Sequence, residues 1–541
     1  MVRWISNPSG VARLRAWHRA WPRVWLGFAL VLVLAGGGLT GCGPKPGPLP
    51  TLLTWPPSAT PAPPSATPQP TATPRPSPTP EPSPTPASPT PAPPTAPPTP
   101  TPDHPDTAQR HRLRAQYLPE IQRVLITHTI TYTNTTGKTL RQLPLVVPPL
   151  QYSTFLFESV DIEGHNVYPQ VDVPTLTWTF ALPRPLAAGE TIHLKLQYQL
   201  VLKPLRRRSA DTARPMVFGY AAQQTNLVDW YPFVPAYDRE RGWIVRRAWP
   251  FGEFLVYPQM SVYVDFTYPA HWKVATNMQL EPCPERHAGR LCGTHVGRGL
   301  VLSLSPYYQV HSHTIALPRR STPVHIEVYA FGGMDEAALR VLTHAQQALT
   351  DFSRWFGPYH RDRLQVVVAA FPFSMEYDGL VFVRKTYWDA PSAGLDALTV
   401  HEIAHQWWFA QVGNDQALHP WMDESLATFS EWLYLRHRAP DRLAWWDTGR
   451  WNGQKPRGYI DGAIYDYSSM LTYREAVYHR GAMFWRAAYE ALGEAELVKL
   501  LSRYVQEHQG QIAWPHDLLD PLARQWPQAP WDAYFRHPPQ P

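Results

Sequence analysis

Proline is the feature that most limits what the first hundred residues of this chain can fold into. Of the 62 prolines in its 541 residues, 27 lie between Pro44 and Pro105, in runs such as TATPRPSPTP. Proline cannot donate a backbone hydrogen bond, and this stretch has too little apolar surface to offset the entropy of ordering it. We therefore expect residues 43–105 to be a disordered Pro/Thr/Ser-rich spacer.

The segment before the spacer has the composition of an export signal. Five arginines precede an apolar run at residues 26–34 (LGFALVLVL), and small residues follow it. The run is shorter than the roughly 20 residues that span a membrane. The next residues, Leu39-Thr40-Gly41-Cys42, resemble a bacterial lipobox, which implies cleavage before Cys42 and lipidation of its thiol. We expect residues 1–42 to be this signal peptide and the mature chain to be an extracytoplasmic, membrane-anchored bacterial lipoprotein; a plain signal peptide is the alternative.

The charge distribution gives no reason to expect nucleic-acid binding. The formal net charge is +6, but it falls to +1 once the five N-terminal arginines are removed. A nearly neutral mature chain has no basic field to attract a phosphate backbone. We therefore expect no nucleic-acid partner.

Two of the three cysteines, Cys283 and Cys292, are close together in the segment PCPERHAGRLC. In an exported protein such a pair predicts a disulfide that closes a small loop. Two free thiols are the alternative, and a zinc knuckle is disfavoured because the chain has no second cysteine pair.

Residues 106–322 have the pattern of a β-rich domain. Segments such as Val124–Asn134, Thr191–Leu202 and Met260–Tyr268 alternate apolar and polar residues and are separated by proline and glycine clusters. Short strands with turn signals predict an antiparallel sandwich, and no convincing helix is found there.

Residues 323–541 have a different pattern, which predicts an α+β domain. Strands are expected at His325–Phe331, Leu364–Phe371 and Gly379–Val383, with a helix over Met334–Phe356. From Asp396 onward the chain is expected to be mainly helical.

Two histidines predict a metal site on the first of these later helices. The helix is expected to be capped by Asp396 and to run to Trp408. Residues four apart share a helix face, so His401 and His405 can direct two imidazoles at one zinc ion. Glu402 lies beside them, where it can take a proton from the attacking water. A helix with solvated histidines is the alternative.

A third zinc ligand is expected at Glu424, separated from His405 by 18 intervening residues. Leu426, Phe429 and Leu433 form the apolar face of a second helix that has Glu424 in its first turn. Catalytic zinc usually has three protein ligands and one open position. A helix–loop–helix of this length can bring the Glu424 carboxylate to the same ion.

The segment HEIAHQWWFAQVGNDQALHPWMDESLATF resembles the zinc-site core of the gluzincin aminopeptidases, the family of aminopeptidase N and leukotriene hydrolase. The resemblance implies one Zn²⁺ held by His401, His405 and Glu424, with Glu402 as the general base. It also implies a β-rich N-terminal domain packed on a thermolysin-like catalytic domain. Only about 60 residues follow Tyr478, so we expect a short form without the family's large helical C-terminal domain.

Two further segments extend the resemblance. Residues 373–377 (FSMEY) lie where the family has Gly-x-Met-Glu-Asn, which implies that Glu376 holds the α-amine of the substrate. Residues 477–482 (VYHRGA) resemble a Tyr-x-Lys-Gly-Ala segment, which implies that Tyr478 hydrogen-bonds to the oxyanion, with Tyr473 as a less favoured candidate. Asp423 and Glu431 are candidates for orienting the zinc ligands.

The function expected from these features is removal of N-terminal residues from peptides outside the cytoplasm by a zinc aminopeptidase. Two alternatives stay open. A membrane-anchored zinc endopeptidase would use the same metal site without needing Glu376. A non-catalytic surface-binding protein would use the β-rich domain and have a vestigial zinc site.

Overall fold

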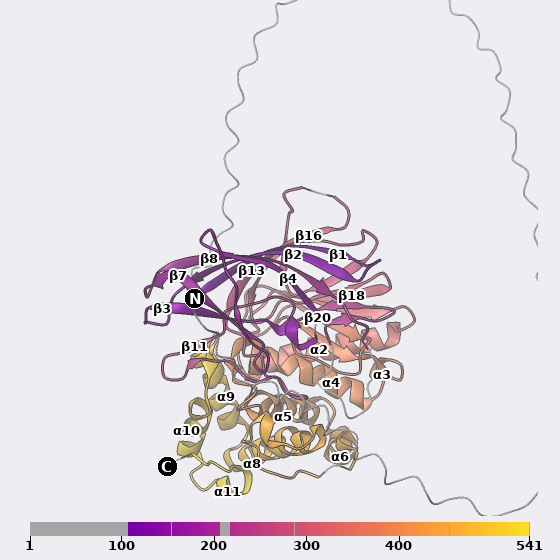
Figure 1. Ribbon diagram of the computed structural model, residues 1–541. Helices are drawn as coiled ribbons and strands as arrows, with labels where there is room; N and C mark the ends of the chain where they lie inside the picture. Colours follow the sequence, from indigo (N-terminus) through magenta and orange to yellow (C-terminus); the bar gives the residue numbers. More distant parts are fainter. Residues whose placement is uncertain (1–106, 153, 206–216, 286, 454, 540–541) are drawn as a thin grey trace, which may run out of the picture. The chain divides into compact units, whose positions relative to one another are not determined.

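The computed structural model describes residues 107–539 apart from residues 153, 206–216, 286 and 454. The expected signal peptide, the lipidation site Cys42 and the proline-rich spacer lie outside the described residues. Strands make up the first half of the described chain and helices most of the second half (Figure 1). The expected α+β class is therefore confirmed.

An eight-stranded sheet is the main layer of the first half, which we call the β domain. Along strands such as β2 and β8 the buried and more exposed side chains alternate, so one face of the sheet packs on the core. All neighbours are antiparallel except β1 and β13, which run parallel, so the sheet is mixed at this one pairing instead of wholly antiparallel. In spatial order the strands are β15 (Gln279–Glu281), β16 (Arg290–Gly297), β13 (Met260–Thr267), β1 (Gln109–Leu118), β2 (Arg123–Thr133), β8 (Thr191–Val201), β4 (Phe155–Ile162) and β5 (His165–Asn166).

Smaller sheets complete the β domain. One has the order β3 (Leu140–Val146), β7 (Thr177–Leu186) and β6 (Gln170–Asp172); a second has the order β14 (Lys273–Thr276), β17 (Leu302–Ser305), β10 (Thr225–Leu227) and β9 (Gly219–Tyr220); and a short pair joins β11 (Tyr237–Asp238) to β12 (Gly242–Trp243). Among the described residues of this domain, the only helical element is the single 3-10 turn η1 (Pro148–Tyr152).

A four-stranded sheet begins the catalytic half, in the order β18 (Tyr308–Ile315), β19 (Val324–Phe331), β20 (Arg363–Ala369) and β21 (Leu380–Arg384). The domain boundary expected between residues 322 and 323 lies in the loop between β18 and β19, which pair antiparallel. Because β18 belongs to the same sheet as β19, the second half of the structure begins at Tyr308.

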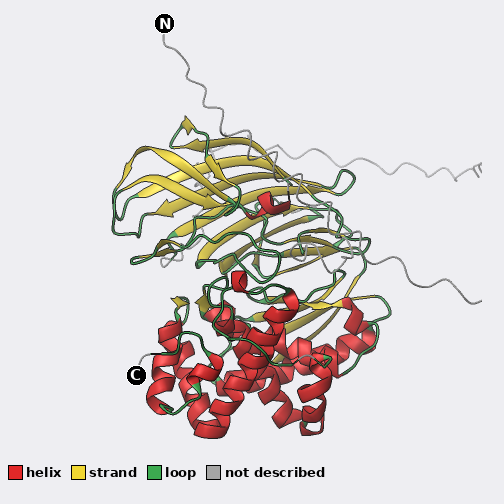
Figure 2. Cartoon of the chain, turned by 60° about the horizontal axis from the view of Figure 1, so that its bottom comes forward, coloured by secondary structure: helices red, strands yellow, loops and turns green. Residues whose placement is uncertain are grey.

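In this half, α2 lies between β19 and β20 in the chain and the other helices follow β21; all of them lie together on one side of the strands (Figure 2). They are α2 (Asp335–Trp355), α3 (Lys385–Trp388), α4 (Ala393–Ala404), η2 (Gln406–Gln411), α5 (Trp421–Arg438), η3 (Pro440–Arg442), α6 (Leu443–Thr448), η4 (Gly449–Trp451), η5 (Ile464–Asp466), α7 (Met470–Tyr473), η6 (Arg474–Arg480), α8 (Gly481–Leu492), α9 (Glu494–His508), α10 (Pro515–Gln525) and α11 (Trp531–Tyr534), with the short strand pair β22 (Gly413–Asn414) and β23 (Ile512–Ala513). None of the helices in the described part of the chain is long and apolar enough to cross a membrane.

The two halves share one continuous core of buried apolar side chains. Hydrogen bonds also cross between them: the Gln224 amide donates to the Val368 carbonyl oxygen at 2.9 Å and accepts from the Ala370 amide at 2.8 Å. The segment Asn226–Tyr237 begins two residues later within β10 and is mostly buried. The β domain therefore holds strand β20, and with it the neighbouring β21, in place.

The arginine Arg298 also bridges the two halves from a fully buried position. Its guanidinium donates to the carbonyl oxygens of Tyr257 and Gln511, both at 2.6 Å, and its backbone amide donates to Asp378 at 3.1 Å. Burial lowers the pKa of Arg298 to about 10, so the side chain is still charged at neutral pH.

Cys283 and Cys292 form a disulfide with their Cα atoms 5.2 Å apart. Cys292 lies on β16, at the far end of the β domain's main sheet, and the bridge closes the loop that leads into this strand.

Candidate metal centre

Helix α4 carries the two histidines, and it begins earlier than the sequence pattern indicated. Ser392 is its N-cap, since its hydroxyl accepts a hydrogen bond from the Gly394 amide. The expected cap, Asp396, is instead fully buried inside the first turn and pairs with Arg340 at 2.5 Å and His344 at 3.0 Å. Although burial raises the pKa of Asp396, these partners lower it below its usual value. Asp396 thus fixes α4 to α2 and leaves capping to Ser392.

The regular helix ends at Ala404, short of the expected Trp408, and continues as the π-helical turn η2. Trp408 has non-helical backbone angles, and its indole donates to the Ser430 hydroxyl at 2.9 Å. The Trp407 indole donates to the Gly357 carbonyl at 2.9 Å. These buried side-chain bonds account for the wider turn, a distortion that is frequent at functional sites.

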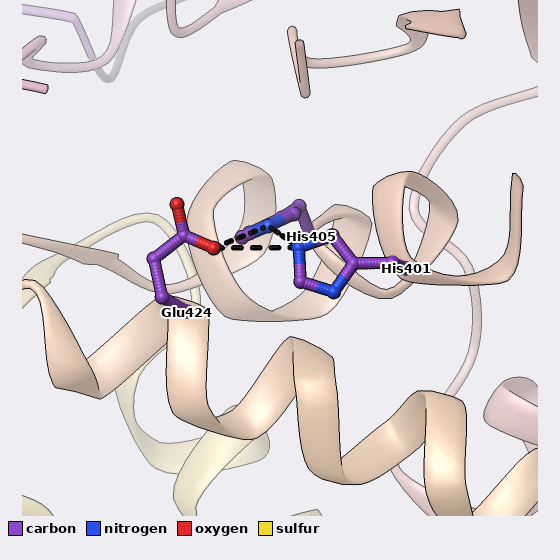
Figure 3. Close-up of side chains that lie close together, drawn as sticks. All are labelled: His401, His405 and Glu424. Carbon is purple, nitrogen blue, oxygen red and sulfur yellow. Dashed lines mark hydrogen bonds and ion pairs between the residues drawn. The ribbon is translucent and has the colours of Figure 1, made fainter. Parts of the chain in front are cut away.

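Helix α5 brings the third ligand to the histidines, with Glu424 in its first turn as expected. Figure 3 shows the Glu424 carboxylate directed at the two imidazole rings. The Nε2 atoms of His401 and His405 are 3.3 Å apart, and Glu424 Oε2 lies 3.3 Å and 3.4 Å from them. All three side chains are buried. The sequence-predicted ligands therefore converge on one point.

The size of this triangle fits zinc. Ligand bonds of about 2.0–2.1 Å in a tetrahedral arrangement place donor atoms about 3.3 Å apart, which matches all three edges. Against the effect of burial, the two histidines lower the pKa of Glu424 to about 2, so the carboxylate is ionised. Burial lowers the pKa of His401, which leaves its imidazole neutral and able to bind a metal. Three protein ligands leave a fourth position for water or substrate.

The surrounding carboxylates also favour a cation. Burial raises the pKa of Glu402 to about 8 and that of Glu376 well above its usual value, although the neighbouring His405 acts in the opposite direction. Burial and the nearby Glu424 raise the pKa of Asp423 to about 8. So many acids in a buried site repel one another, and a divalent cation relieves that repulsion.

Glu431 lies behind His401. Its Oε2 lies 3.7 Å from His401 Nδ1, while Arg450 binds both of its oxygens at 2.9 Å and 3.1 Å. The 3.7 Å contact is longer than a hydrogen bond, and His401 Nδ1 has no hydrogen-bond partner among the described residues, so the orienting role stays a prediction. Asp423, the other candidate, accepts hydrogen bonds from Gln416 and from the Glu424 amide. It therefore supports the start of α5.

Tyr478 enters the site from η6. Its hydroxyl donates to Oε1 of Glu424, and its ring stacks on that of His401 with the centroids 5.9 Å apart. Tyr473 lies behind it, with its ring 5.6 Å from that of Tyr478 and its hydroxyl without a hydrogen-bond partner among the described residues. Of the two tyrosines, Tyr478 is the one that contacts the metal triad.

Glu376 lies in a small pocket next to the triad. Carboxylate oxygens of Glu253, Glu376 and Glu424 all lie within 4.8 Å of one another. Asp229 lines the same pocket, as does Gln416, which approaches Glu376 at 3.5 Å. The pocket can thus hold a cationic group directly beside the metal.

Sequence reasoning missed Asp229 and Glu253. Both come from the β domain, in loops without a periodic pattern or a recognised motif, and only the folded chain brings them to Glu376. Asp229 lies within the mostly buried segment Asn226–Tyr237. Glu253 had no signal of any kind.

The side chain of Gln406, on η2 directly after α4, binds the loop that carries Glu376. Its side-chain amide donates to the Tyr377 carbonyl at 3.1 Å and accepts from the Gly379 amide at 2.8 Å. Between these two residues, Asp378 accepts a hydrogen bond from His360 at 2.8 Å and also pairs with Arg361. The hydrogen bonds of Tyr377, Asp378 and Gly379 therefore fix the loop that carries Glu376.

Comparison with known proteins agrees with this geometry. Residues 340–529 match the model of the Peptidase family M1 domain. Over these residues the chain is similar to the M1 zinc metallopeptidases. Its zinc site is His401, His405 and Glu424, the set that the sequence predicted.

Solved structures show the same fold. The M1 zinc metallopeptidase from Deinococcus radiodurans is 18% identical, covers 77% of this chain and 90% of its own, and has a TM-score of 0.56. A mutant of that enzyme bound to a Tyr-Ser-Ala substrate is 18% identical, covers 80% and 95% respectively, and has a TM-score of 0.58. A two-domain M1 zinc metallopeptidase mutant bound to L-tryptophan has a TM-score of 0.56 at 18% identity. The comparison with curated proteins finds no match.

Proposed function

We propose that this M1 metallopeptidase is an aminopeptidase that removes N-terminal residues from peptides. The observation that carries the proposal is the acidic pocket formed by Glu376, Glu253 and Asp229 directly beside the zinc ligands. A protonated α-amine is a compact cation that such carboxylates bind through charge-assisted hydrogen bonds. The tripeptide bound by the Deinococcus relative supports peptides as the substrate class.

Each residue of the site has a separate role in the proposed hydrolysis. Zinc, when bound, polarises the scissile carbonyl and makes water more acidic. Glu402 accepts the proton of the attacking water and passes it to the leaving amine. Tyr478 donates a hydrogen bond to the oxygen that becomes negative, and Glu376 holds the α-ammonium group. The hydroxyl of Tyr478 reaches that oxygen by leaving Glu424 Oε1, its present acceptor.

Alanine arylamide turnover, with and without a zinc chelator, tests the proposal. We expect hydrolysis that the chelator abolishes and added zinc restores, and little cleavage when the substrate amine is acetylated. Cleavage of free and acetylated substrates at equal rates would favour the endopeptidase alternative. An enzyme that binds zinc but cleaves neither would favour the non-catalytic alternative.

The acidic pocket is tested by neutral variants of its members. Glu376→Ala is expected to reduce kcat/KM for free-amine substrates by about a hundredfold, because an ionic hydrogen bond to the ammonium is lost. Glu253→Gln is expected to have a smaller effect in the same direction. Equal losses on acetylated and free substrates would remove the amine-anchoring role.

We also propose that the protein acts outside the cytoplasm as a lipoprotein anchored through Cys42. The lipobox-like sequence and the proline-rich spacer that follows it support this location. A disulfide between Cys283 and Cys292 is consistent with an oxidising compartment. Metabolic labelling with a palmitate analogue, which the wild type should incorporate and Cys42→Ser should not, tests the anchor; absence of label in the wild type would refute it.

A further inference from the structure

Two arginines beside the metal site, Arg384 and Arg474, have no acidic partner among the residues that the structure describes. No carboxylate of the described chain forms an ion pair with either one. Their neighbour Arg450 is different, because Glu431 binds it through both oxygens. The two unpaired guanidinium groups therefore need another explanation.

Arg384 is the last residue of strand β21 and is only partly exposed. Its guanidinium carbon lies 4.6 Å from the centre of the Tyr387 ring, which holds the group flat against an aromatic face. Its Nε is buried and has no hydrogen-bond partner in the described structure. A buried donor without an acceptor is costly, and a bound ligand can remove that cost.

Arg474 opens η6, four residues before Tyr478, and so lies about one turn away on the same side. Burial and the neighbouring positive charges of Arg450 and Arg384 lower its pKa. Tyr478 and Tyr387 are also among the groups that interact with it. Arg384 and Arg474 thus concentrate positive charge beside the tyrosine that contacts the zinc triad.

The distance from the acidic pocket to these arginines suits a short peptide. Met375 forms an isolated antiparallel bridge with Phe382 of β21, and the Arg384 amide donates to the Ser374 hydroxyl at 3.2 Å. Arg384 therefore lies level with Ser374, two residues along the chain from Glu376. Two extended residues span about 7 Å. A peptide with its amine at Glu376 accordingly reaches the arginines with its second or third residue.

We propose that Arg384 and Arg474 bind a carboxylate on the leaving-group side of the substrate. This carboxylate is either the C-terminus of a dipeptide or tripeptide or an acidic side chain just after the scissile bond. Guanidinium groups bind carboxylates through two parallel hydrogen bonds, which gives geometric selectivity as well as affinity. The inference rests on the proposed aminopeptidase function, because it takes the substrate amine to lie at Glu376.

The test compares matched peptides on the zinc-loaded protein. Ala-Ala as the free acid, Ala-Ala amide and Ala-Glu amide differ only in where, or whether, they present a carboxylate. We expect the wild type to prefer the free acid to the amide by about tenfold or more in kcat/KM. Arg384→Gln and Arg474→Gln should each bring this ratio close to one. If the wild type prefers only the free acid Ala-Ala over Ala-Ala amide, the bound carboxylate is the C-terminus. If it prefers Ala-Glu amide over Ala-Ala amide, the bound carboxylate is the acidic side chain.

Two controls separate this subsite from general damage. Alanine arylamide has no leaving-group carboxylate, so its turnover measures any unspecific loss in each variant. Arg503→Gln, on the exposed face of α9, removes a surface arginine of the same charge and should keep the wild-type ratio. If Arg384→Gln does not fold, Arg474→Gln carries the test, and Arg474→Lys should retain part of the preference.

The outcomes distinguish this inference from the proposed function. Arylamide cleavage with an acid-to-amide ratio that neither arginine variant changes would overturn the carboxylate subsite and leave the aminopeptidase standing. Absence of arylamide cleavage would overturn the aminopeptidase. In that case calorimetric binding of Ala-Ala and Ala-Ala amide to zinc-loaded Glu402→Gln decides the subsite by itself, and equal affinities would refute it.

Discussion

Glu402 combines burial with a place beside the zinc ligand His401. Its environment raises its pKa to about 8, so the side chain holds a proton more readily than an exposed glutamate does. A group that both accepts and releases a proton near neutral pH suits transfer from water to a leaving amine. The structure thus gives a physical basis for the role that the sequence motif implied.

We predict that Glu402→Gln keeps zinc and loses activity. Glutamine has nearly the same shape but cannot accept the proton, so kcat should fall by about 10²–10⁴. Metal analysis should still find one zinc per chain, whereas Glu424→Gln should bind zinc more weakly. Wild-type turnover in zinc-loaded Glu402→Gln would contradict the general-base role.

Residue-scale prediction from the sequence succeeded where the chemistry depends on local spacing. His401 and His405 share a face of one helix, and the apolar pattern after Glu424 placed it in a first turn. Asp229 and Glu253 lie far from Glu376 in the sequence, so no spacing rule connects them. Their contribution depends on how the β domain packs against the catalytic half.

At the scale of elements, sequence patterns located strands and helices but not the irregular turns between them. The strand expected at Thr191–Leu202 is β8, and the helix expected at Met334–Phe356 is α2, each within one residue at either end. The π turn η2 was missed because it depends on tertiary hydrogen bonds of Trp407 and Trp408. The spacing of apolar residues in the sequence gives no information about such tertiary hydrogen bonds.

The π turn η2 leads to a separate prediction, because it places Gln406 against the loop that carries Glu376. Gln406→Ala removes the two hydrogen bonds that fix Tyr377 and Gly379, so the amine-binding carboxylate should shift relative to the zinc. We expect KM for alanine arylamide to rise about tenfold, with zinc content unchanged, since about 1.5 kcal/mol of binding is lost.

Gln411 offers a matched control on the same turn. It is also buried, but its side-chain nitrogen has no hydrogen-bond partner among the described residues. Gln411→Ala should therefore leave KM close to the wild-type value. If both variants raise KM equally, Gln406 has no positioning role beyond filling space.

At the scale of the whole molecule, the β domain contains a buried histidine pair. His111 Nδ1 lies 2.8 Å from His128 Nε2, and His111 Nε2 lies 2.9 Å from Gln109 Oε1. Gln109 Oε1 is an acceptor, so His111 donates from Nε2 and accepts at Nδ1, and both rings are neutral. The rings of Tyr231 and Tyr198 pack edge-on against the pair. Burial lowers the pKa of His111 to about 3 and that of His128 well below its usual value.

This pair predicts loss of stability in acid. The unfolded chain protonates its histidines near pH 6.5, while the folded His111 stays neutral down to about pH 3. Stability is therefore complete above pH 6.5 and falls as the pH drops, by about 2 kcal/mol at pH 5 from His111 alone. Urea unfolding at pH 7 and pH 5 should show that His111→Gln loses less stability than the wild type. The same loss in both proteins would contradict this role, since all other histidines are common to them.

Arg298 has a consequence for how substrates reach the zinc. A charged group in the interior receives its acceptors from Tyr257 in the β domain and from Gln511 after the last long helix. Rotating the two halves apart would remove the Gln511 acceptor and leave that buried charge only partly satisfied. The buried charge therefore holds the two halves in one relative orientation, and we expect substrate to reach the zinc without a hinge motion between them.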